Sequence, residues 1–539
     1  MATQMTDSAE ATALPAVAAP SLRDVAARWF TLGVAGVAAA ATAFFLLRLT
    51  AWPPHEDETL ALFVGRDSLG GVIGHVTHDR GGAPLHFLVA WAVVHLGFGL
   101  AGLRLVSAAC AVGSLFATAA LVARLADRRT ALIATALGAG CWLFLFQGVF
   151  GRMYSLFLFA ATLAALALLR AVDRGQARDW ALWVAALLVT VATHPYGVLV
   201  LGGHGLFILL SHRERLRAAV LAFASVLVLG IPFWLTDVVL AGRFDVGVGG
   251  GGAQLGSVRS VGWYLWWVAG DLAAGWNWVL LPVLAVAVVG LVSLRREAVA
   301  FAVAIVVAPV VAFLGAHLSS TASPQTRHLI FVLPFFGMAV AAGLLRLGRR
   351  VPLLVVLAVA ALLVAEASWT KHRTPLLVTG ESHARVAARH QASAWLATTS
   401  RPDDILFGYE PVYLGAWERN HRFPRTVVPR ADPVLALRTL EHSHSLGRAV
   451  FVIDGSDPNN VAPVKVIDAT APSPEGAFEA RAFGPFLIVR TREPTRTPAQ
   501  FLSYAQLVER MSYAMGIGHA GVNLDTIKRA QIRLAKQPF

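Results

Sequence analysis

The sequence predicts an all-α polytopic membrane protein that carries a small α/β domain near its C-terminal end. Composition is the first reason, because 56% of the 539 residues are hydrophobic, only 14% are charged and the mean hydropathy is +0.62. The second reason is the number of apolar runs that approach the ~20 residues needed to cross a bilayer. The third is a change to mixed, more polar sequence after Trp369.

Eleven apolar runs predict membrane-spanning helices. They cover residues 29–50, 102–124, 131–150, 154–171, 180–193, 196–211, 217–236, 276–294, 298–318, 328–346 and 351–368. A further apolar stretch, Pro84–Phe98, is short and carries His86 and His95, so its length does not show whether it crosses. Cys110 and Cys141 lie inside apolar runs and predict neither a disulfide framework nor a zinc site.

Arginine clusters between the runs predict the sidedness of the chain, because cytoplasmic loops are enriched in Lys and Arg. If Pro84–Phe98 is a juxtamembrane helix, five clusters lie on the side of the N-terminus. They are Arg124/Arg128/Arg129, Arg170/Arg174/Arg178, Arg213/Arg215/Arg217, Arg295/Arg296 and Arg346/Arg349/Arg350. We therefore expect a multi-pass inner (plasma) membrane protein with a cytoplasmic N-terminus and an extracytoplasmic C-terminal domain. The net charge of +13 then reflects topology, not binding to nucleic acid.

This topology predicts four parts. They are a disordered cytoplasmic N-terminus without a cleaved signal peptide (1–28), a transmembrane domain (29–369) with a first outer loop (51–101), an extracytoplasmic α/β domain (370–494) and a basic tail of unknown role (495–539). In the α/β domain the pattern predicts helices at 380–398 and 412–419 and strands at 404–409, 449–454 and 480–490. We expect this domain to cap the outer side and to contact the acceptor.

The outer segment 237–275 contains Gly247 and Gly249 to Gly252. No strand precedes these glycines, so we interpret them as a flexible loop and not as a nucleotide-binding turn. The tryptophans that flank it are typical of an interfacial belt.

Ionisable residues without a topological role gather on the predicted outer face. Asp57 follows the first span, where a carboxylate can take a proton from a substrate hydroxyl, and Glu58 is a second candidate for that role. The alternative is a solvated loop that merely ends a helix. Arg152 and Arg327 each begin a span and either bind a phosphate or extend to the interface. The remaining candidates are Tyr154, His194 and His328 for the donor, and His78, Asp79 and His86 for an acceptor or a metal.

Several of these outer residues also suit a divalent cation. Glu56, Asp57, His78, Asp79 and His86 offer carboxylate and imidazole ligands. Their spacing is not diagnostic of a metal site, so the sequence leaves open whether a divalent ion binds. His204 and His317 lie deeper in apolar runs, and we interpret both as structural.

The order of these motifs resembles a known group of membrane enzymes. The motifs are Asp57-Glu58 after the first span, Asp79, Ala83-Pro84-Leu85-His86-Phe87, Gly102-Leu103-Arg104-Leu105, Arg152-Met153-Tyr154-Ser155-Leu156 and Arg327-His328-Leu329 with Pro334. Over residues 30–370 the chain is similar to the C-type (GT-C) membrane glycosyltransferases related to the protein O-mannosyltransferases of glycosyltransferase family 39 and to the lipid A aminoarabinose transferases. It departs from them at Ala83, where the family commonly has Pro, and at His328, where Tyr is commoner.

The resemblance implies an inverting transferase that moves a sugar from a polyprenyl-phosphate carrier to an acceptor hydroxyl on a glycan, lipid or protein. By similarity Asp57 is the general base, and Asp79, Arg152 and Arg327 line the donor cavity. The C-terminal domain shows no β-trefoil pattern, unlike a eukaryote-like protein mannosyltransferase. The rival functions are a transporter or flippase of lipid-linked sugars and a non-catalytic membrane assembly protein. A transporter predicts internal repeats and acids inside its spans, and the sequence has no evident repeat and few such acids.

Overall fold

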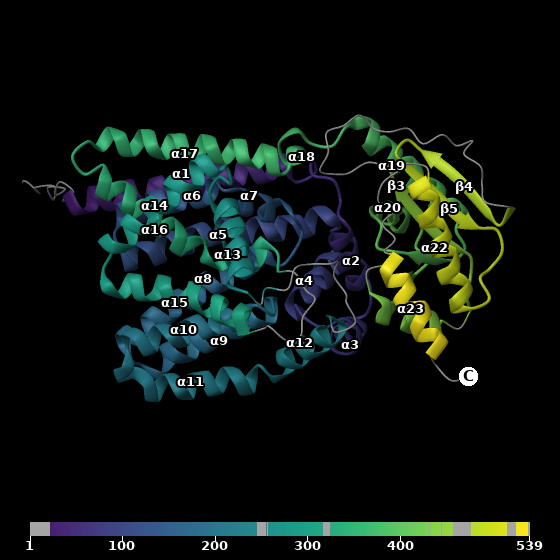
Figure 1. Cartoon of the computed structure of the whole chain (residues 1–539), viewed down its shortest axis with the longest axis horizontal. Helices are drawn as coiled ribbons and strands as arrows, with labels where there is room; N and C mark the ends of the chain where they lie inside the picture. The colour runs from purple at the N-terminus through teal and green to yellow at the C-terminus, as the bar shows by residue number, and fades with distance from the viewer. Residues whose placement is uncertain are drawn as a thin grey trace, which may run out of the picture.

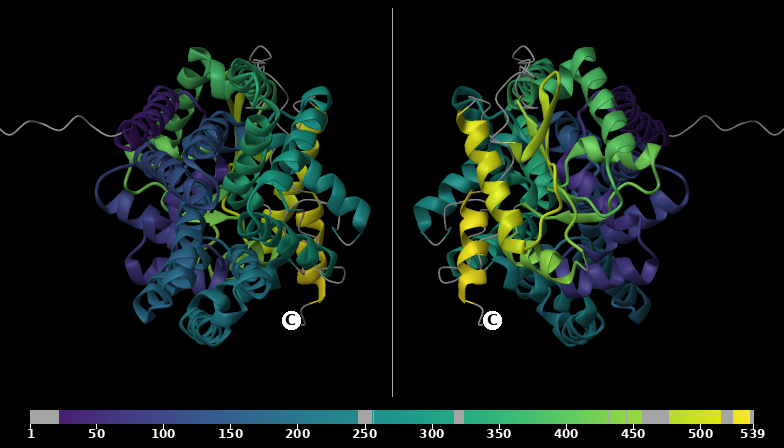
Figure 2. Two further views of the ribbon diagram at one scale, coloured as in Figure 1. Left: turned by 90° about the vertical axis from the view of Figure 1, so that its left-hand side faces the viewer. Right: turned by 90° about the vertical axis from the view of Figure 1, so that its right-hand side faces the viewer.

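The computed structural model describes residues 22–244, 255, 257–315, 324–430, 432–443, 445–455, 476–514 and 524–536. A bundle of long helices and an α/β domain lie end to end, and short helices from the first outer loop lie between them (Figure 1). In the left view of Figure 2 the bundle is seen end-on, with most of its helices running roughly along the line of sight. The chain therefore has one apolar body and one polar body with an intervening layer.

The bundle contains every apolar run that the sequence predicts to span a membrane, apart from the few residues of those runs that lie outside the described ranges. Its helices are α1 (Leu22–Arg48), α5 (Leu100–Leu125), α6 (Arg128–Gly140), α7 (Trp142–Val149), α8 (Tyr154–Arg174), α9 (Ala177–Thr193), α10 (Gly197–Ser211), η2 (Arg213–Arg215), α11 (Leu216–Leu229), α12 (Ile231–Phe244), α13 (Val258–Leu272), α14 (Asn277–Ser293), α15 (Arg296–Gly315), η3 (Thr326–Val332), α16 (Leu333–Leu347) and α17 (Pro352–Arg373).

Six helices of the described chain are long and apolar enough to cross a membrane, and three sharply bent pairs raise this number to nine. The bent pairs are α6 with α7, α11 with α12 and α13 with α14. The shorter helices α9 and α10 account for the other two expected spans. Large apolar side chains such as Leu47, Leu221 and Val292 are exposed on the bundle, as a lipid environment requires. The chain is a multi-pass membrane protein, and the count of eleven spans stays a prediction.

Four of the five arginine-rich loops meet at one end of the bundle. Arg124 at the end of α5 pairs with Asp173 of α8 at 2.7 Å and with Glu297 of α15 at 3.4 Å. Arg295 donates to the Arg124 carbonyl at 2.9 Å, and Arg215 donates to the Val172 carbonyl at 3.1 Å. These contacts place the loops that the arginine pattern assigns to one side close together. Which side of the membrane they occupy stays a prediction.

The first outer loop is helical. It forms α2 (Glu56–Gly65), α3 (Leu69–Gly74), the π-helical turn η1 (His75–Arg80) and α4 (Pro84–His95). The His55 side chain and Glu58 cap the start of α2 reciprocally. Gly81 has φ +67° and lies against α12, where a Cβ atom would come within 2.3 Å of the Thr236 carbonyl oxygen. The glycine turn before α4 therefore fixes the layer between the two bodies.

The α/β domain is a five-stranded sheet with helices on both faces. Its strands are β1 (Ile405–Phe407), β2 (Thr426–Val428), β3 (Ala449–Asp454), β4 (Phe478–Phe483) and β5 (Phe486–Thr491). Their order is β2-β1-β3-β5-β4, parallel from β2 to β3 and antiparallel from β3 to β4. Because side chains alternate along a strand, Phe407 faces one core and Leu406 the other.

Helices α19 (His383–Thr399) and α20 (Pro411–Arg419) cover one face, and α21 (Pro433–His442), α22 (Pro498–Ala514) and α23 (Leu524–Lys536) cover the other. The short α18 (Pro375–Thr379) connects the bundle to this domain. The yellow helices at the flank of the domain in the right view of Figure 2 are α22 and α23. They bury Phe501 and Ile527 against the sheet.

Two segments differ from the sequence interpretation. The expected tail 495–539 supplies α22 and α23, so the described part of it belongs to the α/β domain. The expected loop 237–275 is helical at both ends through α12 and α13. The helices in these segments, α22 and α23 in one and α12 and α13 in the other, are amphipathic or rich in aromatic residues. Their apolar residues are spaced too sparsely for the sequence to predict membrane spans. Gly247, Gly249 to Gly252 and His317 lie outside the described residues.

Candidate active site

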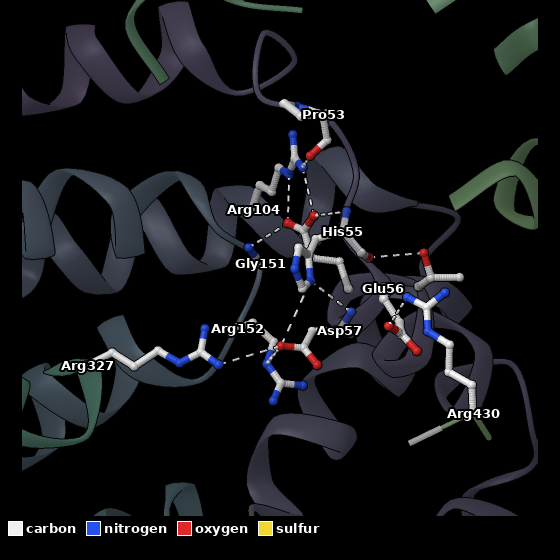
Figure 3. A network of polar contacts seen from close by, with 11 residues as sticks. Pro53, His55, Glu56, Asp57, Arg104, Gly151, Arg152, Arg327 and Arg430 are labelled. Carbon is white, nitrogen blue, oxygen red and sulfur yellow. Dashed lines mark hydrogen bonds and ion pairs between the residues drawn. The ribbon is translucent and has the colours of Figure 1, made fainter. Parts of the chain in front are cut away.

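Asp57 lies in the first turn of α2, at the end of the bundle that faces the α/β domain (Figures 1 and 3). Its side chain is 28% exposed and forms three long ion pairs through one oxygen. That oxygen, Oδ2, is 3.7 Å from Arg152 Nε, 3.9 Å from Arg327 Nη2 and 3.9 Å from His55 Nδ1. The sequence candidates Asp57, Arg152 and Arg327 are therefore brought together from segments almost 300 residues apart.

Glu58 points the other way and is fully buried. It accepts hydrogen bonds from Arg104 Nε at 2.8 Å and Nη2 at 2.7 Å, from the Gly151 amide at 2.7 Å and from the His55 amide at 3.0 Å. A carboxylate with all these donors has no capacity left for a substrate hydroxyl. The geometry favours Glu58 as a positioning residue over the catalytic role considered from the sequence.

Arg104 completes this connection. Beyond Glu58 it donates to the carbonyls of Leu49, Trp52 and Pro53 at 2.8–3.0 Å. The pair thus joins the end of α1, the start of α2, the side of α5 and the turn before α8 (Figure 3). Because Gly151 precedes Arg152, the hydrogen bonds of the Glu58–Arg104 pair also fix the backbone position of Arg152.

The two guanidiniums beside Asp57 are poorly satisfied. The Nε atoms of Arg152 and Arg327 are both buried without a hydrogen-bond partner, and the side chains are only 12% and 20% exposed. Arg327 also lies over the Tyr154 ring at 4.9 Å, which stabilises the cation in a dry setting. Buried cations normally carry close, charge-assisted hydrogen bonds. The arrangement therefore leaves two cations for one loosely held carboxylate.

The electrostatics of this cluster keep Asp57 charged and His86 and His194 neutral. Burial alone would raise the pKa of Asp57, but Arg152, His55 and Arg327 outweigh burial and hold that pKa well below its usual range. Burial lowers the pKa of His86 to about 3, and Arg152 lowers it further while Asp57 opposes the shift. Burial, with help from Arg152 and Arg327, also lowers the pKa of His194 to about 3.

Aromatic rings form the wall behind the arginines. Tyr154, His194, Tyr196 and His328 pack together with ring centroids 4.8–5.9 Å apart. The Nδ1 atoms of His194 and His328 accept backbone amides at 3.1 Å. In the neutral rings the proton then resides on Nε2, so each ring can donate to an anion without adding charge.

A cavity of about 730 Å³ opens beside Arg327. Its wall is largely aromatic, with Trp142, Phe146, Trp263 and Trp267, and it also contains Gln147. The Gln147 side chain is buried, and neither its amide nitrogen nor its amide oxygen has a hydrogen-bond partner. An unpaired buried amide costs ~1–3 kcal/mol, so this side chain is suited to a polar ligand in the cavity.

The acceptor or metal candidates do not all reach this cluster. His86 does, because its charge interacts with Asp57 and Arg152. Asp79 instead pairs with His75 at 3.3 Å and Arg438 at 3.8 Å, and the exposed His78 bonds to its own helical turn. Among the described residues no three His, Cys, Asp or Glu side chains form a metal-binding group.

The sequence and the fold are each similar to those of known proteins. Residues 81–236 match the family model of the dolichyl-phosphate-mannose-protein mannosyltransferases. Comparison by sequence with curated proteins gives no match. The chain superposes on ArnT from Cupriavidus metallidurans in the apo state with a TM-score of 0.54 and 15% identity, covering 86% of this chain and 98% of ArnT. With ArnT bound to undecaprenyl phosphate the TM-score is 0.51 and the identity 16%, over the same shares.

The chain shares the fold of ArnT, and residues 81–236 are similar to the mannosyltransferase family. The resemblance inferred from the sequence and the fold class are thereby confirmed. The arabinofuranosyltransferase AftD from Mycobacteria is a further structural neighbour, with a TM-score of 0.49 and 15% identity over 87% of this chain and 42% of AftD.

Sequence reasoning missed three polar residues of this candidate site. Arg104 is part of the motif Gly102-Leu103-Arg104-Leu105, and an arginine within an apolar run itself indicates a functional or structural role. Gln147 was one polar residue in an aromatic run, and nothing in its spacing shows that it faces a cavity. His55 begins α2, and its capping role becomes visible only once the helix start is known.

Proposed function

We propose that this glycosyltransferase moves a sugar from a polyprenyl-phosphate donor to an acceptor hydroxyl with inversion, and that Asp57 is the general base. The observation that carries the proposal is the pair of under-satisfied guanidiniums, Arg152 and Arg327, on either side of Asp57. Two buried cations facing one acid leave room for a second anion. A phosphate diester supplies that anion and is also the leaving group of a polyprenyl-phosphate sugar.

The donor phosphate would lie between Arg152 and Arg327, with the Nε2 protons of His194 and His328 as further donors. When the acceptor oxygen bonds to the anomeric carbon, the bond from that carbon to the phosphate oxygen breaks. The phosphate then gains negative charge, and guanidiniums fixed in a dry site stabilise that charge more than water does. The apolar cavity beside Arg327 is suited to the first prenyl units.

Asp57 would take the acceptor proton. Its depressed pKa keeps it ionised at physiological pH but also makes it a weak base while both arginines pair with it. A bound phosphate draws the guanidiniums toward itself and releases Asp57 from these pairs. The acid therefore becomes a stronger base only after the donor has bound, which predicts that the donor binds before the acceptor.

Membrane orientation is part of the proposal. The arginine-rich end of the bundle would be cytoplasmic, as the positive-inside pattern predicts, and the active site and the α/β domain would face the extracytoplasmic side. The ArnT complex with undecaprenyl phosphate supports a lipid-linked donor for this fold.

A direct test measures binding of undecaprenyl phosphate to the purified protein in neutral detergent. We expect saturable binding that Arg327→Gln weakens and Asp57→Asn leaves intact or strengthens, because Asp57→Asn removes an anion that competes for the arginines. Transfer is then measured with undecaprenyl-phosphate mannose and arabinose, and the anomeric configuration of the product is determined. Absence of saturable binding, or retention of configuration in the product, would overturn the proposal.

A further inference from the structure

A second cavity lies between the bundle side and the α/β domain, apart from the donor cluster. Its volume is about 850 Å³. Residues of α2, of the turn that follows it and of η1 form one wall, and residues of β2, α20 and α21 form the other. Asp57, Arg152 and Arg327 do not line it. The cavity is therefore a separate space that exists only because the two bodies meet.

Charge in this cavity is unbalanced. Its wall contains the guanidiniums of Arg66, Arg80, Arg425 and Arg438 and the carboxylates of Asp67 and Asp79. Both carboxylates already pair with His75, at 3.4 and 3.3 Å, and Asp79 also pairs with Arg438. Arg438 shares Asp79 and Arg80 donates to the Tyr409 hydroxyl, so neither lining carboxylate forms an ion pair with Arg66 or Arg425 among the described residues.

Two of the cations repel each other. Arg425 is exposed, and Arg66 lies over the Trp417 ring with its carbon 5.6 Å from the ring centroid. Burial lowers the pKa of Arg66, and the charge of Arg425 lowers it further, while Glu418 opposes the shift. Like charges held together across a domain boundary cost free energy that an anionic ligand would relieve.

The cavity is connected to the reaction centre through α2. Asp57 is in the first turn of this helix and Arg66 follows its last turn, nine residues later. At 1.5 Å per residue this separation is about 13 Å. A ligand that binds Arg66 and also presents a hydroxyl to Asp57 must therefore be longer than one sugar ring.

We propose that this cavity binds a phosphate or carboxylate group of the acceptor, through Arg66 and Arg425 on opposite walls. The acceptor is then an anionic molecule that extends about 13 Å along α2 from its anchored charge to its reacting hydroxyl. Its identity as the acceptor rests on the proposed glycosyl transfer, whereas the anion-binding property of the cavity does not.

The test uses inorganic pyrophosphate as the probe, with the full-length protein in neutral detergent and binding measured by calorimetry. We expect the double change Arg66→Gln with Arg425→Gln to weaken the cavity affinity at least ten-fold. Arg401→Gln with Arg422→Gln is the matched control, because it removes the same charge from exposed positions that do not line the cavity. Arg327→Gln should leave this binding event in place while it weakens undecaprenyl phosphate binding.

Two results would overturn the inference. One is equal pyrophosphate affinity in the cavity variant and the control, and the other is loss of all pyrophosphate binding in Arg327→Gln alone. Neither result touches undecaprenyl phosphate binding, so the failure of this inference and of the proposed function can be told apart. A second arm compares bilayer discs of phosphatidylcholine with discs that also contain phosphatidylglycerol. Competition by phosphatidylglycerol identifies a lipid headgroup as the source of the anion, and its absence identifies a soluble acceptor.

Discussion

The arginines at the two ends of the bundle are paired in opposite ways. At the end away from the α/β domain, Arg124 has two acids, with its closest contact to Asp173 at 2.7 Å. At the other end, Arg152 and Arg327 share Asp57 at 3.7 and 3.9 Å. The first set of contacts completes the hydrogen bonding of a structural loop. The second set is incomplete, and this is the basis of the proposed phosphate site.

The difference shows that sequence position alone does not separate the two roles. Both sets are arginines at helix ends, and both fit a topological signal or an interfacial side chain. What separates them is the number of acids within reach and the burial of the unpaired nitrogen atoms. Four variants test this comparison.

Glu58→Ala should have the largest effect, because it removes one partner of a fully buried ion pair. Arg104 would be left charged and buried, which typically costs ~3–5 kcal/mol of stability. We expect a large fall in the unfolding temperature or loss of folded protein, measured by thermal unfolding in detergent. Asp173→Ala at the exposed pair is the control and should change the unfolding temperature little. A Glu58→Ala protein with wild-type stability would show that the Glu58–Arg104 pair does not stabilise the fold.

Asp57→Asn should act on the reaction and not on folding. The amide keeps the shape of the side chain but cannot accept the acceptor proton, so transfer should fall ~10²–10⁴-fold. The measurement is kcat with a polyprenyl-phosphate sugar, beside the unfolding temperature. Turnover close to that of the wild type would move the base to another group, because the geometry of Glu58 offers no replacement.

These two variants also show what the sequence could and could not predict. Composition and run length predicted the helices, since burial in lipid requires apolar, internally bonded segments. The position of Asp57 beside two arginines followed from their common predicted face. The opposite fates of Asp57 and Glu58 did not, because neighbouring residues on a helix point about 100° apart and only the packing of α5 decides which one meets Arg104.

The C-terminal region illustrates a second limit. The predicted strands at 404–409 and 449–454 appear as β1 and β3, and the predicted β segment at 480–490 appears as β4 and β5, because runs of apolar residues specify them. The sequence predicts a polar, basic tail over residues 495–539 with a helical start near Pro498, and α22 begins there. The packing of this tail on the sheet is not evident from the sequence, because α23 buries few residues, among them Ile527 and Ala530. The cavity wall at Arg66 and Arg425 was also invisible, because its two sides are more than 350 residues apart in the sequence.

Arg327→Ala sharpens the comparison between the two ends directly. We expect undecaprenyl phosphate affinity to fall by about ten- to one-hundred-fold, the loss of one charge-assisted contact of ~1.5–3 kcal/mol. Arg124→Ala removes the same side chain from the paired end and should leave that affinity unchanged. Equal losses in both variants, measured by the same binding assay, would show that the effect comes from general helix packing.

The smallest effect, per unit of pH, is expected where the balance of charge is reversed. Arg430 is one guanidinium between two carboxylates, Glu56 of α2 and Glu410 of the α/β domain. Burial raises the pKa of Glu410 to about 7, with Arg430 opposing and Glu56 adding to the shift, because a single cation does not compensate both acids. Glu56 and Glu410 share Arg430. Burial lowers the pKa of Arg430, but the charges of Glu410 and Glu56 outweigh burial and raise it.

The sign of the resulting pH dependence follows from proton counting. Between the ordinary glutamate pKa of ~4.3 and about 7, folded Glu410 keeps its proton while the unfolded chain has lost it, so this residue makes stability fall as pH rises. The slope is at most about 1.4 kcal/mol per pH unit. Glu410→Gln fixes the neutral form, so its unfolding temperature relative to wild type should rise from pH 4.5 to 7 and level off above pH 7. A difference that stays constant over this range would mean that Arg430 fully compensates both acids, which would remove the contrast with Arg152 and Arg327.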